Sequence, residues 1–96
     1  MNDDIPIVES RFELGFIGVT PGVEAQIPPN EAINAIRRHA RCDWGNLDDE
    51  DIRQNEWSLE NSALLLSVYQ STARVKFYII TEADRSSTTV LLPREY

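Results

Sequence analysis

The last third of the chain constrains the fold more than any other part. Residues 63–69, 74–81 and 88–92 are three segments of strand length, each rich in apolar, β-branched and aromatic residues. That composition is typical of β-strands. The polar separators, residues 70–73 and 82–87, are short enough for hairpins, and consecutive strands usually pair with each other. The sequence therefore predicts three consecutive antiparallel strands.

An earlier segment predicts one more strand. In residues 12–19, Phe12, Leu14 and Phe16 alternate with Glu13 and smaller residues. Alternation with a period of two is typical of a half-buried strand. The following residues 20–22, Thr-Pro-Gly, predict a turn because proline fixes φ and glycine allows a positive φ.

Two helices are expected between the first strand and the other three. Asn30 follows two prolines and suits the N-cap of a helix that ends near Ala40, with Ile33, Ile36 and Ala40 on its buried face. The second helix starts from Asp48 as N-cap, with Asp51 three residues later, and continues to about Leu59 or Glu60.

These elements predict the α+β class, with two helices packed on one face of a small antiparallel sheet and the order β-α-α-β-β-β. At 96 residues the chain has room for one hydrophobic core. Residues 11–96 are expected to form a single domain. Residues 1–10 lack a sustained period and are expected to form a loose N-terminal arm that docks through Ile5, Ile7 and Val8.

Charge and cysteine content limit the functional classes. The net charge of −7 repels a nucleic-acid backbone, which disfavours direct DNA or RNA binding and favours a basic protein partner. The acidic N-terminus and the absence of a long apolar run argue against export and membrane insertion. Cys42 is the single cysteine, which suits a reducing compartment, so we expect a cytoplasmic protein.

Two segments carry a resemblance to a known group of sequences. Residues 39–47 (HARCDWGNL) and 79–96 (IITEADRSSTTVLLPREY) resemble short hypothetical proteins of bacterial plasmids, phages and integrative elements, some of them labelled plasmid-related proteins. The resemblance covers roughly the last two-thirds of the chain. This family has no established activity, so the resemblance implies a mobile genetic element as the setting and no chemistry.

The acidic stretch of residues 43–60 is the first candidate for function. It contains seven carboxylates and one arginine, Arg53. Such a surface can dock on a basic groove of a partner. The alternative is a solvated helix whose first-turn carboxylates are favoured by the helix dipole by roughly 0.3–1 kcal/mol each. The residues expected to bind a partner are Asp43, Trp44, Asp49, Glu50, Glu56, Asp84 and Arg85.

A small hydrolase or metal-dependent enzyme is the alternative function. It would use His39, Asp43, Asp84 and Arg85, which must then converge in space. The spacing of His39 and Cys42 superficially resembles part of a metal site, but a structural zinc needs four ligands and the chain holds one histidine and one cysteine. No catalytic residue, metal site or cofactor is therefore assigned.

Two further segments allow more than one role. They are the loop of residues 82–87 and the basic cluster of Arg37, Arg38 and Arg41. Asp84 can form an Asx-turn within the loop, or Asp84 and Arg85 can contact a partner. The arginines can bind nucleic acid, but the acidic helix nearby opposes this. The sequence thus favours a non-enzymatic protein-binding module of a mobile element, which binds or inhibits a host or element-encoded protein, and leaves its oligomeric state open.

Overall fold

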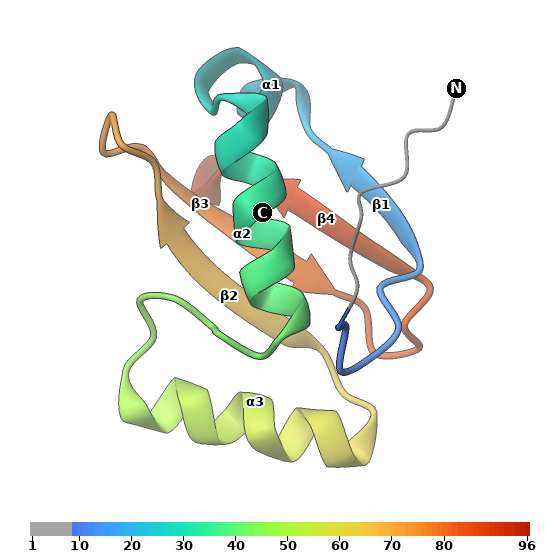
Figure 1. Ribbon diagram of the computed structural model, residues 1–96. Coiled ribbons are helices and arrows are strands. Elements are labelled where there is room, and N and C mark those ends of the chain that lie inside the picture. Colours follow the sequence, from blue (N-terminus) through green and yellow to red (C-terminus); the bar gives the residue numbers. More distant parts are fainter. Residues whose placement is uncertain (1–8) are drawn as a thin grey trace.

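The computed structural model describes residues 9–96 (Figure 1). The arm expected to dock through Ile5, Ile7 and Val8 lies outside the described residues. The element order is β1 (Phe16–Val19), α1 (Pro21–Gln26), α2 (Pro29–Ala40), α3 (Asp49–Asn61), β2 (Leu65–Gln70), β3 (Lys76–Thr81), β4 (Ser87–Leu91) and the 3₁₀ helix η1 (Pro93–Glu95). Helices followed by a run of three strands confirm the predicted α+β class.

The sheet contains the three predicted C-terminal strands as two hairpins, with the strand order β1-β4-β3-β2. The β2–β3 and β3–β4 pairs are antiparallel, as predicted. β1 is parallel to β4, with Phe16 beside Ser87 and Val19 beside Val90. The sheet is therefore mixed, not wholly antiparallel as expected, because β1 joins a strand that comes about seventy residues later and no local pattern encodes that pairing.

The first helix, α1, replaces the predicted turn. The Thr20 side chain accepts a hydrogen bond from the Val23 amide at 3.3 Å, and Pro21 stands at the start of the helix. Threonine at the N-cap and proline at the first helical position both favour a helix start. The Glu95 carboxylate also accepts a bond from the Gly22 amide at 3.0 Å, so η1 is anchored on the start of α1.

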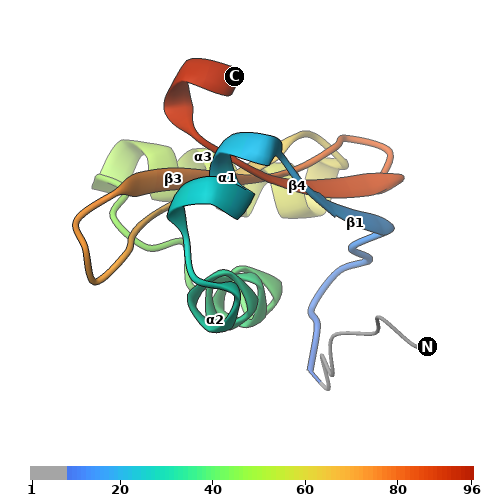
Figure 2. The same cartoon turned by 90° about the horizontal axis from the view of Figure 1, so that it is seen from above.

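The second helix covers one face of the sheet (Figures 1 and 2). Its buried residues are Ala32, Ala35, Ile36, His39 and Ala40. Most of them join a core cluster with Phe77, Ile79 and Val90 of the central strands. Ile33, expected on the buried face, is half-buried.

The third helix begins where the sequence predicted. Asp48 is its N-cap and accepts a bond from the Asp51 amide at 2.9 Å. The helix runs along the outer edge of β2, while α2 lies over the sheet (Figure 1). The Asn55 side chain fixes this position, because its amide donates to the Leu66 carbonyl at 2.6 Å and accepts from the Leu66 amide at 3.1 Å.

Candidate partner-binding surface

The outward side of α3 is acidic and open to solvent. Asp49, Glu50 and Asp51 lie in its first turn, where the helix dipole stabilises carboxylates, and all three are exposed. The inward side carries Asn55 and Ser58, which are buried against β2. The solvent side is therefore free for contact with another molecule.

Trp57 lies on this solvent side, with 55% of its surface exposed. Helix periodicity places Arg53 and Gln54 one turn before it and Glu60 and Asn61 one turn after it, and all four are exposed. Glu50, two turns before Trp57, falls on the same side. An apolar indole surrounded by polar and charged groups is the composition of an interface anchor.

Trp44, the tryptophan predicted to bind a partner, is only 4% exposed. Its ring stacks on Phe12, with the centroids 6.2 Å apart, and meets the His39 ring edge-on at 5.6 Å. Its Nε1 donates to the Glu56 carboxylate at 3.2 Å. Trp44 therefore anchors the loop before α3, and Glu56 holds its indole, so neither side chain is free in the way the sequence suggested.

Asp43 lies on the same loop and is paired. The Arg38 guanidinium donates to both its carboxylate oxygens, at 2.7 and 3.2 Å. This hydrogen bond lowers the pKa of Asp43, against a smaller opposing effect of burial. The main-chain oxygen of Asp43 also accepts a bond from the Tyr69 hydroxyl at 2.6 Å. The Asp43 carboxylate remains half-exposed, but its geometry is that of a loop anchor.

Arg85 is a structural group and not a free cation. Its guanidinium donates to the carbonyls of Ala63 at 2.6 Å and Ser58 at 3.0 Å, at the C-terminal end of α3. It also donates to the Glu82 carbonyl at 3.1 Å. A cation is favoured at a helix C-terminus, where carbonyls lack partners. Arg85 therefore ties the β3–β4 loop to α3.

Asp84, beside it, remains exposed and caps its own loop. Its carboxylate accepts a bond from the Ser86 amide at 2.9 Å, which is the Asx-turn weighed from the sequence. Bonds to Ser86 lower the pKa of Asp84.

His39 is completely buried and takes part in a chain of side-chain hydrogen bonds. The Thr88 hydroxyl donates to the Leu14 carbonyl at 2.6 Å. A hydroxyl has one hydrogen, so Thr88 must accept from Thr81 at 2.8 Å, and Thr81 must then accept from His39 Nε2 at 2.8 Å. His39 Nδ1 lies 2.6 Å from the Ser67 hydroxyl.

The donor count places a proton on Nε2, and burial keeps the imidazole neutral, so Nδ1 is the acceptor. Burial, with a smaller effect of the Arg85 charge, lowers the pKa of His39 to about 3. Every nitrogen of the ring has a partner within the fold. His39 thus connects α2 with β2, β3 and β4, and it has no nitrogen directed at solvent.

The four groups of the alternative enzyme are separately engaged. His39 and Arg85 both contact the Phe12 ring, at 5.3 Å between ring centroids and 5.9 Å from the guanidinium carbon, but Asp43 pairs with Arg38 and Asp84 with Ser86. Cys42, three residues beyond His39, is half-buried, and burial raises the pKa of its thiol. Among residues 9–96, no three His, Cys, Asp or Glu side chains are placed to hold a metal ion.

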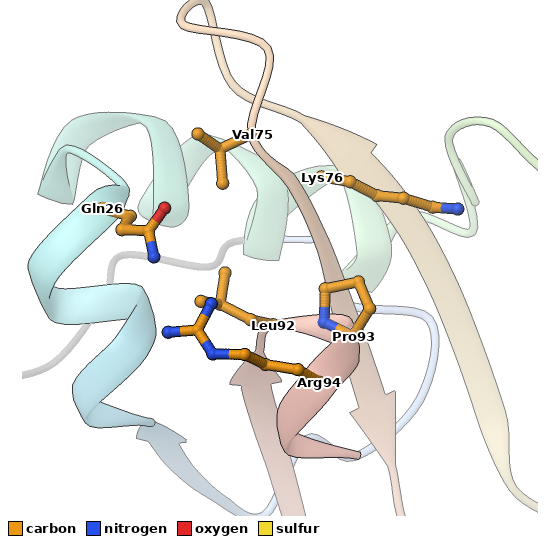
Figure 3. Close-up of a pocket in the computed structure, with 6 residues that line it drawn as sticks. All are labelled: Gln26, Val75, Lys76, Leu92, Pro93 and Arg94. Atoms are coloured by element: carbon orange, nitrogen blue, oxygen red, sulfur yellow. The ribbon is translucent and has the colours of Figure 1, made fainter.

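A shallow depression of about 260 Å³ lies elsewhere, between α1, the start of β3 and η1 (Figure 3). Its lining residues are Gln26, Val75, Lys76, Leu92, Pro93 and Arg94. Figure 3 shows the Lys76 side chain extending away from the other five. No residue proposed from the sequence as a site residue lines it.

Comparisons with protein-family models, with curated proteins and with solved structures found no match to this chain. In the part that the structure describes, no helix is long and apolar enough to cross a membrane.

Three features of this region were not predicted as such. Trp57 was not among the residues expected to bind a partner, and nothing local distinguished it from Trp44. Asn55 carried no signal for its bonds to β2, although an asparagine inside a helix is unfavourable enough to suggest a specific role. The hydrogen-bonded hydroxyls belong to one residue on each of the last three strands, namely Ser67, Thr81 and Thr88, and all three are buried on the face toward α2. A polar residue at a position where strand alternation predicts burial was the available signal for this network.

Proposed function

We propose that this chain is a non-enzymatic protein-binding module that engages a basic surface of another protein through the outward side of α3. The observation that supports this most is the exposure of Trp57, which lies in the acidic helix α3 and is 55% exposed. A large aromatic side chain left in water has an unfavourable hydration, which burial against a partner removes.

Charge complementarity defines the partner. The stretch of residues 43–60 holds seven carboxylates and one arginine. Asp43 is paired and Glu56 holds Trp44, but Asp49, Glu50 and Glu60 are exposed. A basic partner surface would be steered toward these groups, and the indole would supply the contact area. The proposed binding surface therefore consists of Asp49, Glu50, Trp57 and Glu60.

Asp84 can add to the proposed binding surface, and Arg85 does not. Asp84 is exposed and lies on the loop that Arg85 ties to the end of α3, so it can add one carboxylate near the helix. The Arg85 guanidinium donates to three main-chain carbonyls. Its role in the proposal is to hold the loop in place.

The biological setting is part of the same proposal. The resemblance of residues 39–47 and 79–96 to short proteins of plasmids and phages supports a mobile genetic element as the source. In that setting the partner is a host or element-encoded protein, which the module binds or inhibits. The single cysteine supports the cytoplasm as the compartment. Binding of this kind requires no cofactor.

The proposal is tested by capturing partners from a bacterial lysate with the full chain on a support. Trp57→Ala and the double variant Glu50→Lys with Glu60→Lys change only exposed side chains, so the fold should change in stability by no more than about 0.5 kcal/mol. We expect both to lose the captured protein, and added salt to release it from the unchanged chain.

Glu24→Lys is the control for charge reversal at a single site, with half the charge change of the double variant, because Glu24 is an exposed carboxylate on α1, away from the proposed surface. It should capture the same protein as the unchanged chain. Capture that survives both α3 substitutions would remove this surface from the account. Capture lost equally with Glu24→Lys would mean that only net charge matters.

A further inference from the structure

We propose that β1 is a self-association edge, at which two copies of this chain pair antiparallel about Gly18 and join their sheets. The proposal does not depend on the function of α3, because α3 lies along the opposite edge of the sheet (Figure 1). It rests on the main-chain geometry of β1 and on two residues of that strand.

The two edges of the sheet are treated differently by the fold. The outer edge of β2 is covered. The Asn55 side chain bonds the main chain of Leu66, and the loop before α3 bonds both the amide and the carbonyl of Val68. No segment among residues 9–96 pairs with the outer edge of β1. Figures 1 and 2 both show β1 at the margin of the sheet, with no labelled element beyond it. Uncovered edges are templates for pairing with another strand.

The hydrogen bonds to β4 determine which groups of β1 point outward. The Phe16 amide donates to the Ser86 carbonyl at 3.0 Å, and the Thr20 amide donates to the Val90 carbonyl at 3.1 Å. In a parallel pair, alternate residues direct both N–H and C=O to the same neighbour. The main-chain groups of Ile17 and Val19 therefore point away from the sheet.

A second copy satisfies these outward groups symmetrically. An antiparallel pair with Ile17 opposite Val19 of the second copy places Gly18 opposite Gly18 on a two-fold axis. Each Ile17–Val19 pair then exchanges two main-chain hydrogen bonds, as hydrogen-bonded antiparallel pairs do. A two-fold interface uses the same patch on both copies, and this register meets that condition.

The side chains of β1 favour a second copy over an arbitrary strand. Phe16 is 82% exposed and shares a face with Gly18, on the side opposite Ile17, which packs on the core. Among residues 9–96, a Cβ at Gly18 would meet nothing within 4 Å. In the proposed register, Phe16 lies diagonal to Gly18 of the second copy and can cover it, a pairing of an aromatic ring with an edge glycine.

The sequence of β1 lacks three of the usual devices that protect an edge strand from association. Phe16–Val19 has no charge, no proline and no bulge. The net charge of −7 on each copy opposes dimerisation, and salt screens that repulsion. The dimer should therefore be favoured by higher salt. It would present two outward α3 surfaces, one at each end of the joined sheet.

Sedimentation of the full chain over a range of concentrations tests the proposal. We expect the average mass to rise toward that of a dimer, with amides of Val19 and Ile17 gaining protection from hydrogen exchange as concentration rises. Val19→Pro deletes one outward amide and is compatible with an edge strand. Phe16→Lys changes an exposed side chain, so it stays informative if the proline variant unfolds. Each should weaken dimerisation about tenfold or more, which is about 1.4 kcal/mol or more.

Leu64→Lys is the control, because Leu64 is an exposed apolar residue next to β2, at the other edge. It should dimerise like the unchanged chain. A chain that stays monomeric at all concentrations and salts overturns the proposal. A dimer that survives Val19→Pro and Phe16→Lys overturns it as well, because pairing would then occur elsewhere.

Discussion

At the scale of single residues, the two tryptophans have opposite surroundings. Trp44 lies between Phe12, His39 and Glu56 and is 4% exposed, whereas Trp57 is 55% exposed. Burial of an indole of this size stabilises a fold by several kcal/mol at about 25 cal/mol per Å². Trp44 thus contributes this burial to stability, whereas more than half of the Trp57 surface remains in water.

His39 shows how a titratable residue can be used for the fold alone. Its two nitrogens bond Ser67 and Thr81, and the chain of bonds continues to Thr88 and Leu14. Buried polar groups that keep all partners specify one arrangement of the core. The network therefore fixes α2, the last three strands and the segment before β1 relative to one another.

This burial predicts a loss of stability in mild acid. The unfolded chain protonates His39 near its ordinary pKa of about 6.5, whereas the folded chain resists protonation until its pKa of about 3. The unfolded state therefore binds the extra proton as pH falls, and stability decreases by up to about 1.4 kcal/mol per pH unit. Denaturant unfolding should show a loss of about 2 kcal/mol from about pH 7 to about pH 5.

The carboxylates do not confuse that measurement. Asp43, Asp84 and Glu95 have lowered pKa values in the fold because of hydrogen bonds from Arg38, Ser86 and Thr20, so their contributions are lost only as pH falls below their ordinary values of about 4. An imidazole resonance that titrates near its ordinary pKa in the folded protein would contradict the assignment of His39, as would stability that stays constant over this range.

At the scale of elements, the sequence was sufficient to predict those helices and strands whose formation depends on residues close together in the chain. Asp48 and Asp51 identified the start of α3, and the apolar runs identified β2, β3 and β4. The same kind of signal was misleading at Thr20-Pro21-Gly22, because proline and threonine serve turns and helix starts equally well. The parallel pairing of β1 with β4 had no local signal, since it depends on residues far apart in the chain.

Asn55 carries the clearest prediction at this scale. Asn55→Ala removes both bonds to the main chain of Leu66 and leaves a strand edge without its cover. Unsatisfied buried polar groups cost roughly 1–3 kcal/mol each, so the free energy of unfolding should fall by about 2 kcal/mol or more. Hydrogen exchange should show the Leu66 amide losing its protection.

Gln54→Ala is the matched control for Asn55→Ala. Gln54 is the adjacent amide on the exposed side of α3, and its one side-chain bond, to Ser58, is long at 3.4 Å. Its loss removes one long bond to the Ser58 hydroxyl, so it should lower the free energy of unfolding by clearly less than Asn55→Ala does. A Leu66 amide that remains protected in Asn55→Ala would show that α3 is held on β2 by packing alone.

At the scale of the whole molecule, residues 9–96 cover the outer edge of β2 and leave that of β1 without a paired strand. α3 and the loop before it cover β2 (Figure 1). Trp57 and the first-turn carboxylates of α3 are exposed. β1 lies at the other edge. The sequence predicted the location and the charge of the candidate surface. It did not predict that Trp57 and not Trp44 is the exposed tryptophan, because burial of Trp44 depends on Phe12 and His39 meeting it in space.

The central claim is that Trp57 and the carboxylates around it contact another protein. A photo-reactive amino acid tests this directly, when Trp57→benzoylphenylalanine is produced in a bacterial host and irradiated in the cell. We expect a discrete cross-linked protein of basic character, absent when the same group replaces Glu24 on α1. Absence of any adduct at position 57, or the same adducts from both positions, would contradict the claim.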